Sequence, residues 1–366
     1  MKTTICCISD SHLGYRHKMK QQRLRDYEDS FKDALSRAMA LEPEILIFGG
    51  DLVHHTRPEP KSMHTVLKTL MEIADSTQVV MCIGNHEIEG HLGSAYTPIF
   101  SDLHKNIHVL TTENPHITIK VYGKRIGIHG FQYLRDRKLA EKTLRRISDE
   151  IPGYGDVNIL CMHQAIEHYL SPFEISIKVL REVAPRFDLI LSGHVHRHQK
   201  IMEISDLTPG FYIGSTERIS FNEWQNPNGF LVFRNLDFKN PEFVRINSAS
   251  MKRISKDIGR KTPAEINSYI EELIKENLNQ KCLQININAE IQGDYFDIRH
   301  DWETLFREFT ILDVNVIPRM GEDEIKIKRF EINSSVIDEY FEKSGMKDRK
   351  ELKELCVELF KKYSGG

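Results

Sequence analysis

Several features are missing from this sequence, and each absence narrows what the protein can be. None of the six cysteines belongs to a C-x-x-C pair, and most lie in apolar runs, so we expect reduced core residues of a cytosolic protein. No apolar stretch approaches the length of a membrane span, so we expect no membrane contact. The Gly-x4-Gly-Lys-Ser/Thr pattern is also absent, which argues against nucleotide hydrolysis by the P-loop route.

The sequence also lacks a strong net charge. Its 366 residues carry 50 Lys and Arg against 53 Asp and Glu, so bulk electrostatics neither require nor exclude a nucleic-acid partner. Hydrophobic residues make up 40% and charged residues 28%, as in a soluble globular protein, and the length allows two domains. The chain reaches Asp10 and His12 too soon for the apolar core of a signal peptide, so we expect no secretion leader.

What the sequence does have is histidine, with 17 residues, several of them in short motifs after apolar runs. Ile45 to Phe48 is one such run, and Gly49-Gly50 after it allows a sharp turn into Asp51. In open α/β sheets, functional groups gather at the carboxyl ends of strands. The same arrangement recurs at Asp10-Ser11-His12, Gly84-Asn85-His86-Glu87, His163-Gln164 and Gly193-His194-Val195-His196.

Taken singly, each motif has an ordinary structural explanation, such as a turn or a packed histidine. Taken together, the strand ends offer seven oxygen and nitrogen ligands and no sulfur: Asp10, His12, Asp51, Asn85, His163, His194 and His196. One metal would leave some of them unused, whereas two metals that share Asp51 would use all. Two-metal sites stabilise both the attacking and the leaving oxygen of an in-line displacement. The donor set suits Mn²⁺, Fe or Zn²⁺ better than a soft metal.

Three other segments carry weaker signals, and two of them leave alternatives open. Residues 16–25 are basic, which favours a solvated loop, with a phosphate-backbone contact as the alternative. Tyr27 to Leu41 is predicted to be an amphipathic helix. A later apolar stripe has helical spacing, which fits either core packing or a dimer-forming helix. Its residues are Tyr96, Ile99, Phe100 and Leu103.

Beyond residue 200, few motifs indicate catalytic or metal-binding residues. Ile201 to Phe233 is strand-rich and should complete a second sheet of a β-sandwich. Thr262-Pro263-Ala264-Glu265 is a capping box that predicts a helix start, and strands are predicted at 282–291 and 311–317. We expect four regions: a first domain over 1–238, an α+β domain over 239–317, a linker over 318–333 and a helix-loop-helix over 334–366.

Two apolar stripes lie in the last region. The first consists of Val336, Ile337, Tyr340 and Phe341, and the second of Leu352, Leu355, Cys356, Leu359 and Phe360. A helical hairpin of about thirty residues buries too little surface to fold firmly alone. It either packs on its own domain or docks to a partner helix or coiled coil, and we favour the partner.

The motifs from Asp10 to His196, in this order, resemble those of the calcineurin-like metallophosphoesterases. The resemblance spans residues 5–200. Within that superfamily the chain looks like the Mre-eleven/SbcD family of double-strand-break repair nucleases. The residues that carry this narrower likeness are Asp10-Ser11-His12-Leu13-Gly14-Tyr15, Gly50-Asp51-Leu52-Val53-His54 and His163-Gln164. It implies an α/β fold: a metallophosphoesterase β-sandwich flanked by helices, a small α+β capping domain and a C-terminal helical hairpin.

The resemblance also implies a site with two Mn²⁺ ions per chain, with Mg²⁺, Fe or Zn²⁺ as alternatives, and a metal-bound hydroxide as nucleophile. His86 would assist phosphodiester cleavage by stabilising the transition state or protonating the leaving 3′ oxygen. His54 would influence the handling of duplex ends, and a cationic imidazole is expected at either position. One metal would lie on Asp10, His12, Asp51 and His196, and the other on Asp51, Asn85, His163 and His194.

The implied function is a Mn-dependent DNA nuclease, acting as a 3′–5′ exonuclease on duplex DNA and an endonuclease on single strands. It would process double-strand breaks in the cytoplasm, at the nucleoid, with a coiled-coil ABC-type ATPase bound through residues 334–366. A homodimer is implied through the Met63 and Tyr96–Leu103 helices.

One departure keeps other functions open. Glu87 stands where the nuclease family more often has Asp, and Gly-Asn-His-Glu is also the pattern of phosphoprotein phosphatases. Those enzymes have Asp-Arg-Gly after the second motif, whereas this chain has His54-His55. A metallophosphatase or a cyclic-nucleotide phosphodiesterase therefore ranks second. A scaffold subunit that tethers DNA ends is the third possibility.

Overall fold

The apolar runs form two stacked six-stranded sheets in the computed structural model, which describes residues 3–89, 94–151, 153–170, 174–319 and 350–363. The first sheet has the order β14 (Glu242–Arg245), β13 (Gly229–Arg234), β1 (Thr4–Ile8), β2 (Ile45–Phe48), β3 (Gln78–Met81) and β6 (Ile107–Val109). The second has the order β11 (Gln199–Lys200), β12 (Gly210–Tyr212), β10 (Leu189–Ser192), β9 (Val157–Met162), β8 (Lys124–Gly130) and β7 (His116–Val121).

Side-chain alternation explains why the central strands are apolar throughout. On β1, Ile5 and Cys7 face the core between the two sheets, whereas Cys6 and Ile8 face the helices outside. A strand that is buried on both faces has no solvent side on which polar residues could be placed. All six cysteines are free of disulfides and five are buried, as expected.

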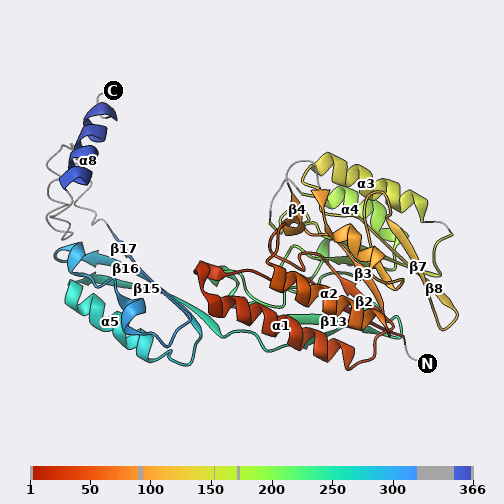
Figure 1. Cartoon of the computed structure of the whole chain (residues 1–366), viewed down its shortest axis with the longest axis horizontal. Helices are drawn as coiled ribbons and strands as arrows, with labels where there is room; N and C mark the ends of the chain where they lie inside the picture. The colour runs from red at the N-terminus through yellow and green to blue at the C-terminus, as the bar shows by residue number, and fades with distance from the viewer. Residues whose placement is uncertain (1–2, 90–93, 152, 171–173, 320–349, 364–366) are drawn as a thin grey trace.

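Helices cover both outer faces of the sandwich (Figure 1). They are α1 (Gln21–Met39) and α2 (Pro60–Ala74) on the first sheet, with α3 (Arg137–Glu150) and α4 (Ile177–Val183) on the second. The α1 helix begins six residues before the predicted start at Tyr27, because Leu24 already belongs to its buried face. Among the described helices, none combines the length and apolar character that crossing a membrane requires. The predicted helix-flanked α/β sandwich is confirmed.

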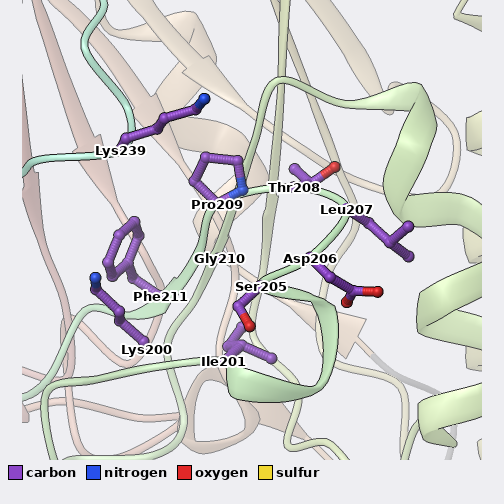
Figure 2. Close-up of a pocket in the computed structure, with 10 residues that line it drawn as sticks. All are labelled: Lys200, Ile201, Ser205, Asp206, Leu207, Thr208, Pro209, Gly210, Phe211 and Lys239. Carbon is purple, nitrogen blue, oxygen red and sulfur yellow. The ribbon is translucent and has the colours of Figure 1, made fainter.

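The parallel strands bring the predicted motifs to one edge of the sandwich. Strands β1, β2 and β3 run parallel in the first sheet, and β9 and β10 run parallel in the second. The loops that follow all five strands therefore leave from their carboxyl ends. A hollow of about 350 Å³ lies at the amino end of β12, between Lys200 and Lys239 and over Phe211 (Figure 2). None of the seven candidate ligands lines it.

The first sheet extends further along the chain than expected. Strand β14 pairs with β13 and lies beyond residue 238, where we expected the first domain to end. We propose that the boundary falls between β14 and the next strand, β15 (Met251–Lys261). The sequence alone did not reveal β14, because it is short and lies in the composition shift near Asn240-Pro241.

A small parallel sheet follows and extends away from the sandwich (Figure 1). It consists of β15, β16 (Cys282–Ile291) and β17 (Ile311–Pro318), and α5 (Pro263–Lys275) packs on it. The predicted capping box is present, since Glu265 Oε2 accepts from the Thr262 N–H at 2.9 Å and Thr262 Oγ1 accepts from the Glu265 N–H at 3.3 Å.

The basic segment 16–25 is neither a plain solvated loop nor a row of free phosphate ligands. Lys18 pairs with Asp313 of the small sheet at 2.8 Å, and Lys20 pairs with Glu303. Arg23 is fully buried and pairs with Asp26 at 3.0 Å. Local sequence could not predict this, because the acidic partners of Lys18 and Lys20 lie almost 300 residues away. The segment therefore links the sandwich to the small sheet, which together with α5 we call the small domain.

The Tyr96–Leu103 stripe forms a 3₁₀ helix, η3 (Thr97–Asp102), rather than an α-helix. In a 3₁₀ helix, residues three apart share a face, so Phe100 and Leu103 lie together while Ile99 lies on a different face. Phe100 is buried in the core beside Tyr96 and Leu103, which favours packing, whereas Ile99 is 60% exposed. Met63 on α2 packs partly against the same core.

The second C-terminal stripe lies on a helix, α8 (Lys350–Tyr363), which Figure 1 shows beyond the small sheet and apart from the sandwich. Its Leu352 and Leu355 are 40% and 50% exposed. The predicted stripe at 336–341 and nearly all of the predicted linker lie outside the described residues.

Candidate metal centre

The loops after five strands bring most of the candidate ligands into direct contact. His163 Nε2 lies 3.3 Å from Asp51 Oδ2 and 3.2 Å from Asn85 Oδ1. The same Asp51 oxygen lies 3.9 Å from His12 Nε2, which is itself 3.1 Å from His196 Nε2. The Asp51 carboxylate thus faces ligand atoms from both sheets, in the position expected of a shared ligand.

Asp10 and His194 complete the cluster. Asp10 Oδ1 lies 3.6 Å from His196 Nε2 and 3.9 Å from His163 Nε2. It also accepts a hydrogen bond from the His194 backbone N–H at 3.1 Å. The His194 ring lies 5.1 Å from the His163 ring, measured between centroids. All seven predicted ligands therefore lie at or beside one centre.

The backbone is strained at four of these ligands. Asp10, His12, Asp51 and His194 have φ values of 50°, 45°, 50° and 73°, in the left-handed region that side chains disfavour. Each such residue costs on the order of 1–3 kcal/mol and persists only where the surrounding structure enforces it. Clustering of this strain at one point marks a functional site, independently of any sequence motif.

Glycines in the motifs allow the loops to approach one another. Gly50 has a φ of 103°, and a Cβ at this position would lie 2.3 Å from His163 Nδ1. A Cβ on Gly84 would lie 2.0 Å from Asp51 Oδ1 and 2.4 Å from the Asp51 backbone nitrogen. These residues are glycine because a side chain would occupy the space of the ligands.

Acceptors outside the cluster orient three imidazole rings. His163 Nδ1–H donates to the Gly49 carbonyl at 2.8 Å, and His196 Nδ1–H donates to Glu223 Oε1 at 2.9 Å. His194 Nε2–H donates to Glu174 Oε1 at 3.0 Å. In each ring the other nitrogen stays available as a ligand, which is the usual arrangement of metal-binding histidine.

Sequence reasoning missed Glu174 and Glu223. They lie 20 and 27 residues from the histidines that they orient, and no spacing rule links them. The only available signal is general: metal-binding histidines need such acceptors, and the chain has 53 acidic residues to choose from.

The electrostatics of the cluster favour a cation. Burial by itself would lower the pKa of His163, but the Asp51 and Asp10 carboxylates raise it to about 10. Burial likewise opposes the charge on His196, but Glu223 and Asp10 raise its pKa to about 9. Burial would raise the pKa of Asp51, yet the neighbouring histidines hold it below its usual range. The carboxylates thus attract positive charge, and the buried O/N donors suit a divalent metal ion.

His54 and His86 lie beside the cluster and stack on each other, with ring centroids 4.4 Å apart. His86 Nδ1–H donates to the His54 carbonyl at 3.0 Å, and the His86 backbone N–H donates to Asp51 Oδ1 at 2.9 Å. His54 Nδ1 lies 3.1 Å from His12 Nδ1. Burial together with repulsion by His86 and His55 lowers the pKa of His54 to about 3, so His54 is neutral and not the cation that we expected.

Glu87, the departure noted in the third motif, has a structural role. Its Oε2 accepts a hydrogen bond from the Gly84 N–H at 2.9 Å and closes the turn that carries Asn85. Burial, reinforced by the charge of Asp51, raises the pKa of Glu87 to about 8. The residue therefore holds the loop in a position where burial disfavours its charged form.

The family model for calcineurin-like phosphoesterases matches residues 3–198, more than half of the chain. The chain therefore belongs to the calcineurin-like phosphoesterase family, and the predicted class of metal-dependent phosphoesterase is confirmed. Three archaeal relatives are each named DNA double-strand break repair protein Mre11, which bears out the narrower resemblance.

These relatives are similar at modest identity over most of their length. The protein of Methanocaldococcus jannaschii is 26% identical over 69% of this chain and 71% of its own. That of Methanococcus maripaludis is 23% identical over 89% of this chain and 91% of its own. That of Thermoplasma acidophilum is 25% identical over 91% and 88%.

Substituting Gly84 by alanine tests the packing of this centre. The added Cβ would collide with both the side chain and the backbone of Asp51, so Gly84→Ala should reduce the Mn²⁺ retained per chain after dialysis and destabilise the fold by about 1–3 kcal/mol. The control is Gly123→Ala. Its added Cβ would meet no other part of the protein within 4 Å, so this variant carries only the backbone cost of a φ of 82°. Equal Mn²⁺ retention in the two variants would contradict this account.

Proposed function

We propose that this protein is a metal-dependent DNA nuclease that processes double-strand breaks. The observation that carries the proposal is a cluster in which the candidate ligands surround Asp51 while His86 stands beside it, fixed by two hydrogen bonds. The relatives named as DNA double-strand break repair proteins support the substrate class. The loop after Asp51 carries His54-His55 where the phosphatases have arginine, which favours a phosphodiester over a phosphomonoester.

The residues of the cluster would hold two divalent ions, with Asp51 serving both. We propose Mn²⁺, with Mg²⁺, Fe or Zn²⁺ as alternatives. The first position would use Asp10, His12, Asp51 and His196, and the second would use Asp51, Asn85, His163 and His194. When bound, such ions polarise a phosphodiester and lower the pKa of water.

The protein groups orient the site and supply a proton. His86 donates through Nδ1 to the His54 carbonyl, so its Nε2 is the atom left for the substrate. A proton on Nε2 would neutralise charge on the leaving 3′ oxygen. Neutral His54 cannot serve as a second cation, and its contact with His12 Nδ1 gives it an orienting role instead. We propose 3′–5′ exonuclease action on duplex DNA and endonuclease action on single strands.

The substrate assay uses purified protein with Mn²⁺ and either linear duplex DNA or a phosphopeptide. The wild type should degrade DNA, and His86→Ala should reduce cleavage by about 10²–10⁴-fold with unchanged Mn²⁺ content, because neither proposed metal position uses its side chain. His104→Ala, a histidine outside the cluster, is the control.

Other outcomes of this assay identify the alternatives. Release of phosphate from the peptide with intact DNA would establish a phosphatase. Bridging of DNA ends without cleavage, in protein that retains Mn²⁺, would establish a scaffold. Full activity in His86→Ala would remove the role assigned to His86.

We propose a homodimer formed by the surface around η3 and α2. Ile99 is 60% exposed there, and replacing it alone avoids disturbing buried Phe100. Ile99→Asp should shift the protein from dimer to monomer in light scattering, because a carboxylate in an apolar interface is costly. Met202→Asp alters a side chain that is 64% exposed on the second sheet's side of the molecule and should leave the dimer intact. A persistent dimer in Ile99→Asp would reject this interface.

We also propose that the C-terminal region, residues 334–366, docks to a coiled-coil ABC-type ATPase, which would supply the ATP chemistry that this chain lacks. Support comes from α8, which lies apart from the sandwich in Figure 1 and on which Leu352 and Leu355 are exposed. The double variant Leu352→Glu with Leu355→Glu should lose co-elution with such an ATPase while keeping its Mn²⁺. Glu354→Ala on the same helix is the matched control, and undiminished co-elution of the leucine variant would refute the docking surface.

A further inference from the structure

A short helix lies where the small domain meets the sandwich. This helix, η6 (Phe221–Glu223), places the buried Phe221 against Met251, Cys282 and Ile311. Those three residues are the first of β15, β16 and β17 and lie in register with one another. Phe221 therefore packs against the base of the small parallel sheet, and the half-buried Trp224 joins the same cluster.

The next residue of η6 also contacts the small domain. Asn222 Oδ1 accepts a hydrogen bond from Arg253 Nη1 of β15 at 2.6 Å. We call Phe221, Asn222, Trp224 and Arg253, with the three strand starts, the seat of the small domain. Through these contacts, a displacement of the small sheet acts directly on η6.

The third residue of η6 reaches the metal centre. Glu223 Oε1 accepts from His196 Nδ1–H at 2.9 Å, and Glu223 Oε2 accepts from the Ile219 N–H at 2.9 Å. Because both oxygens are bound, the carboxylate cannot turn freely to follow His196 if η6 moves. Three consecutive residues thus pack on the small domain, bond to it, and orient a candidate ligand.

The other histidine of the motif provides an internal comparison. His194 is oriented by Glu174, whose second oxygen accepts from the Ala165 N–H at 2.6 Å. Ala165 belongs to the core under α3 and α4, so Glu174 is held by groups within the sandwich. Two carboxylates thus orient two neighbouring histidines. Of the two, Glu223 is the one that lies on η6, the helix that contacts the small domain.

We propose that Glu223 is a positioning residue through which the seating of the small domain sets the orientation of His196 and the affinity of one metal position. The inference rests on the proposed two-metal site. Loss of an outer hydrogen-bond partner of a ligating histidine typically costs 10–100-fold in metal affinity. A loosened seat should therefore weaken the position that uses His196 and spare the one that uses His194.

The test measures Mn²⁺ binding to the full chain by titration calorimetry. Glu223→Gln should weaken one of two positions by about tenfold, and Glu174→Gln should weaken the other by a similar factor. A seat variant, Trp224→Ala with Arg253→Ala, touches no ligand and should weaken the same position as Glu223→Gln.

Combining the variants separates coupling from general destabilisation. The seat variant should add little to Glu223→Gln, because the connection is already broken, but its effect should multiply with that of Glu174→Gln. Asn222→Ala is the milder seat variant if the double substitution fails to fold, as judged by circular dichroism. Asn222→Ala should produce the same pattern of changes in Mn²⁺ affinity, with smaller magnitudes.

The proposed coupling between the small domain and the His196 position is rejected if the seat variants leave both Mn²⁺ affinities unchanged. It is also rejected if the effect of the seat variants multiplies fully with that of Glu223→Gln. These outcomes differ from failure of the proposed metal site, in which the wild type itself would bind fewer than two Mn²⁺ ions. Glu223→Gln with unaltered affinity at both positions would also reject the positioning role.

Discussion

The structure depends on one buried carboxylate. Asp51 follows β2 in the first sheet, yet its side chain meets His163 from the second sheet at 3.3 Å and His12 from its own sheet at 3.9 Å. The same carboxylate accepts from the backbone of His86. A carboxylate buried to this extent is unfavourable unless positive charge compensates it, so the loops of both sheets must converge on it. The proposed metal ions would supply that charge.

The close approach of the loops has costs that the rest of the sandwich must offset. Four candidate ligands sit in left-handed backbone positions, and glycines stand where a side chain would strike a ligand. Strands that are buried on both faces provide the rigid base, because their apolar side chains fill three layers of core. Stability from those layers allows strain to remain at the strand ends, where it holds the site in one geometry.

The small domain is connected to this centre and is not merely attached to the sandwich. Its three strands begin at η6, which also carries the acceptor for His196. Ion pairs from the segment before α1 to Asp313 and Glu303 hold it from a second side. The small domain is thus linked by direct contacts to the proposed metal centre, although it contributes no candidate ligand to it.

The sequence by itself determined the strand-end motifs and the seven candidate ligands, and its resemblance to a known family implied the helix-flanked sandwich. The motifs depend on local patterns, such as an apolar run, a glycine and a polar residue, which the chain carries within a few positions. Tertiary structure decided the rest: the acceptors Glu174 and Glu223, the burial of Arg23, the neutral state of His54, the division of the Tyr96–Leu103 stripe and the place of β14. Each of these follows from contacts between segments far apart in the chain, or from burial that such contacts create, and no local spacing encodes them.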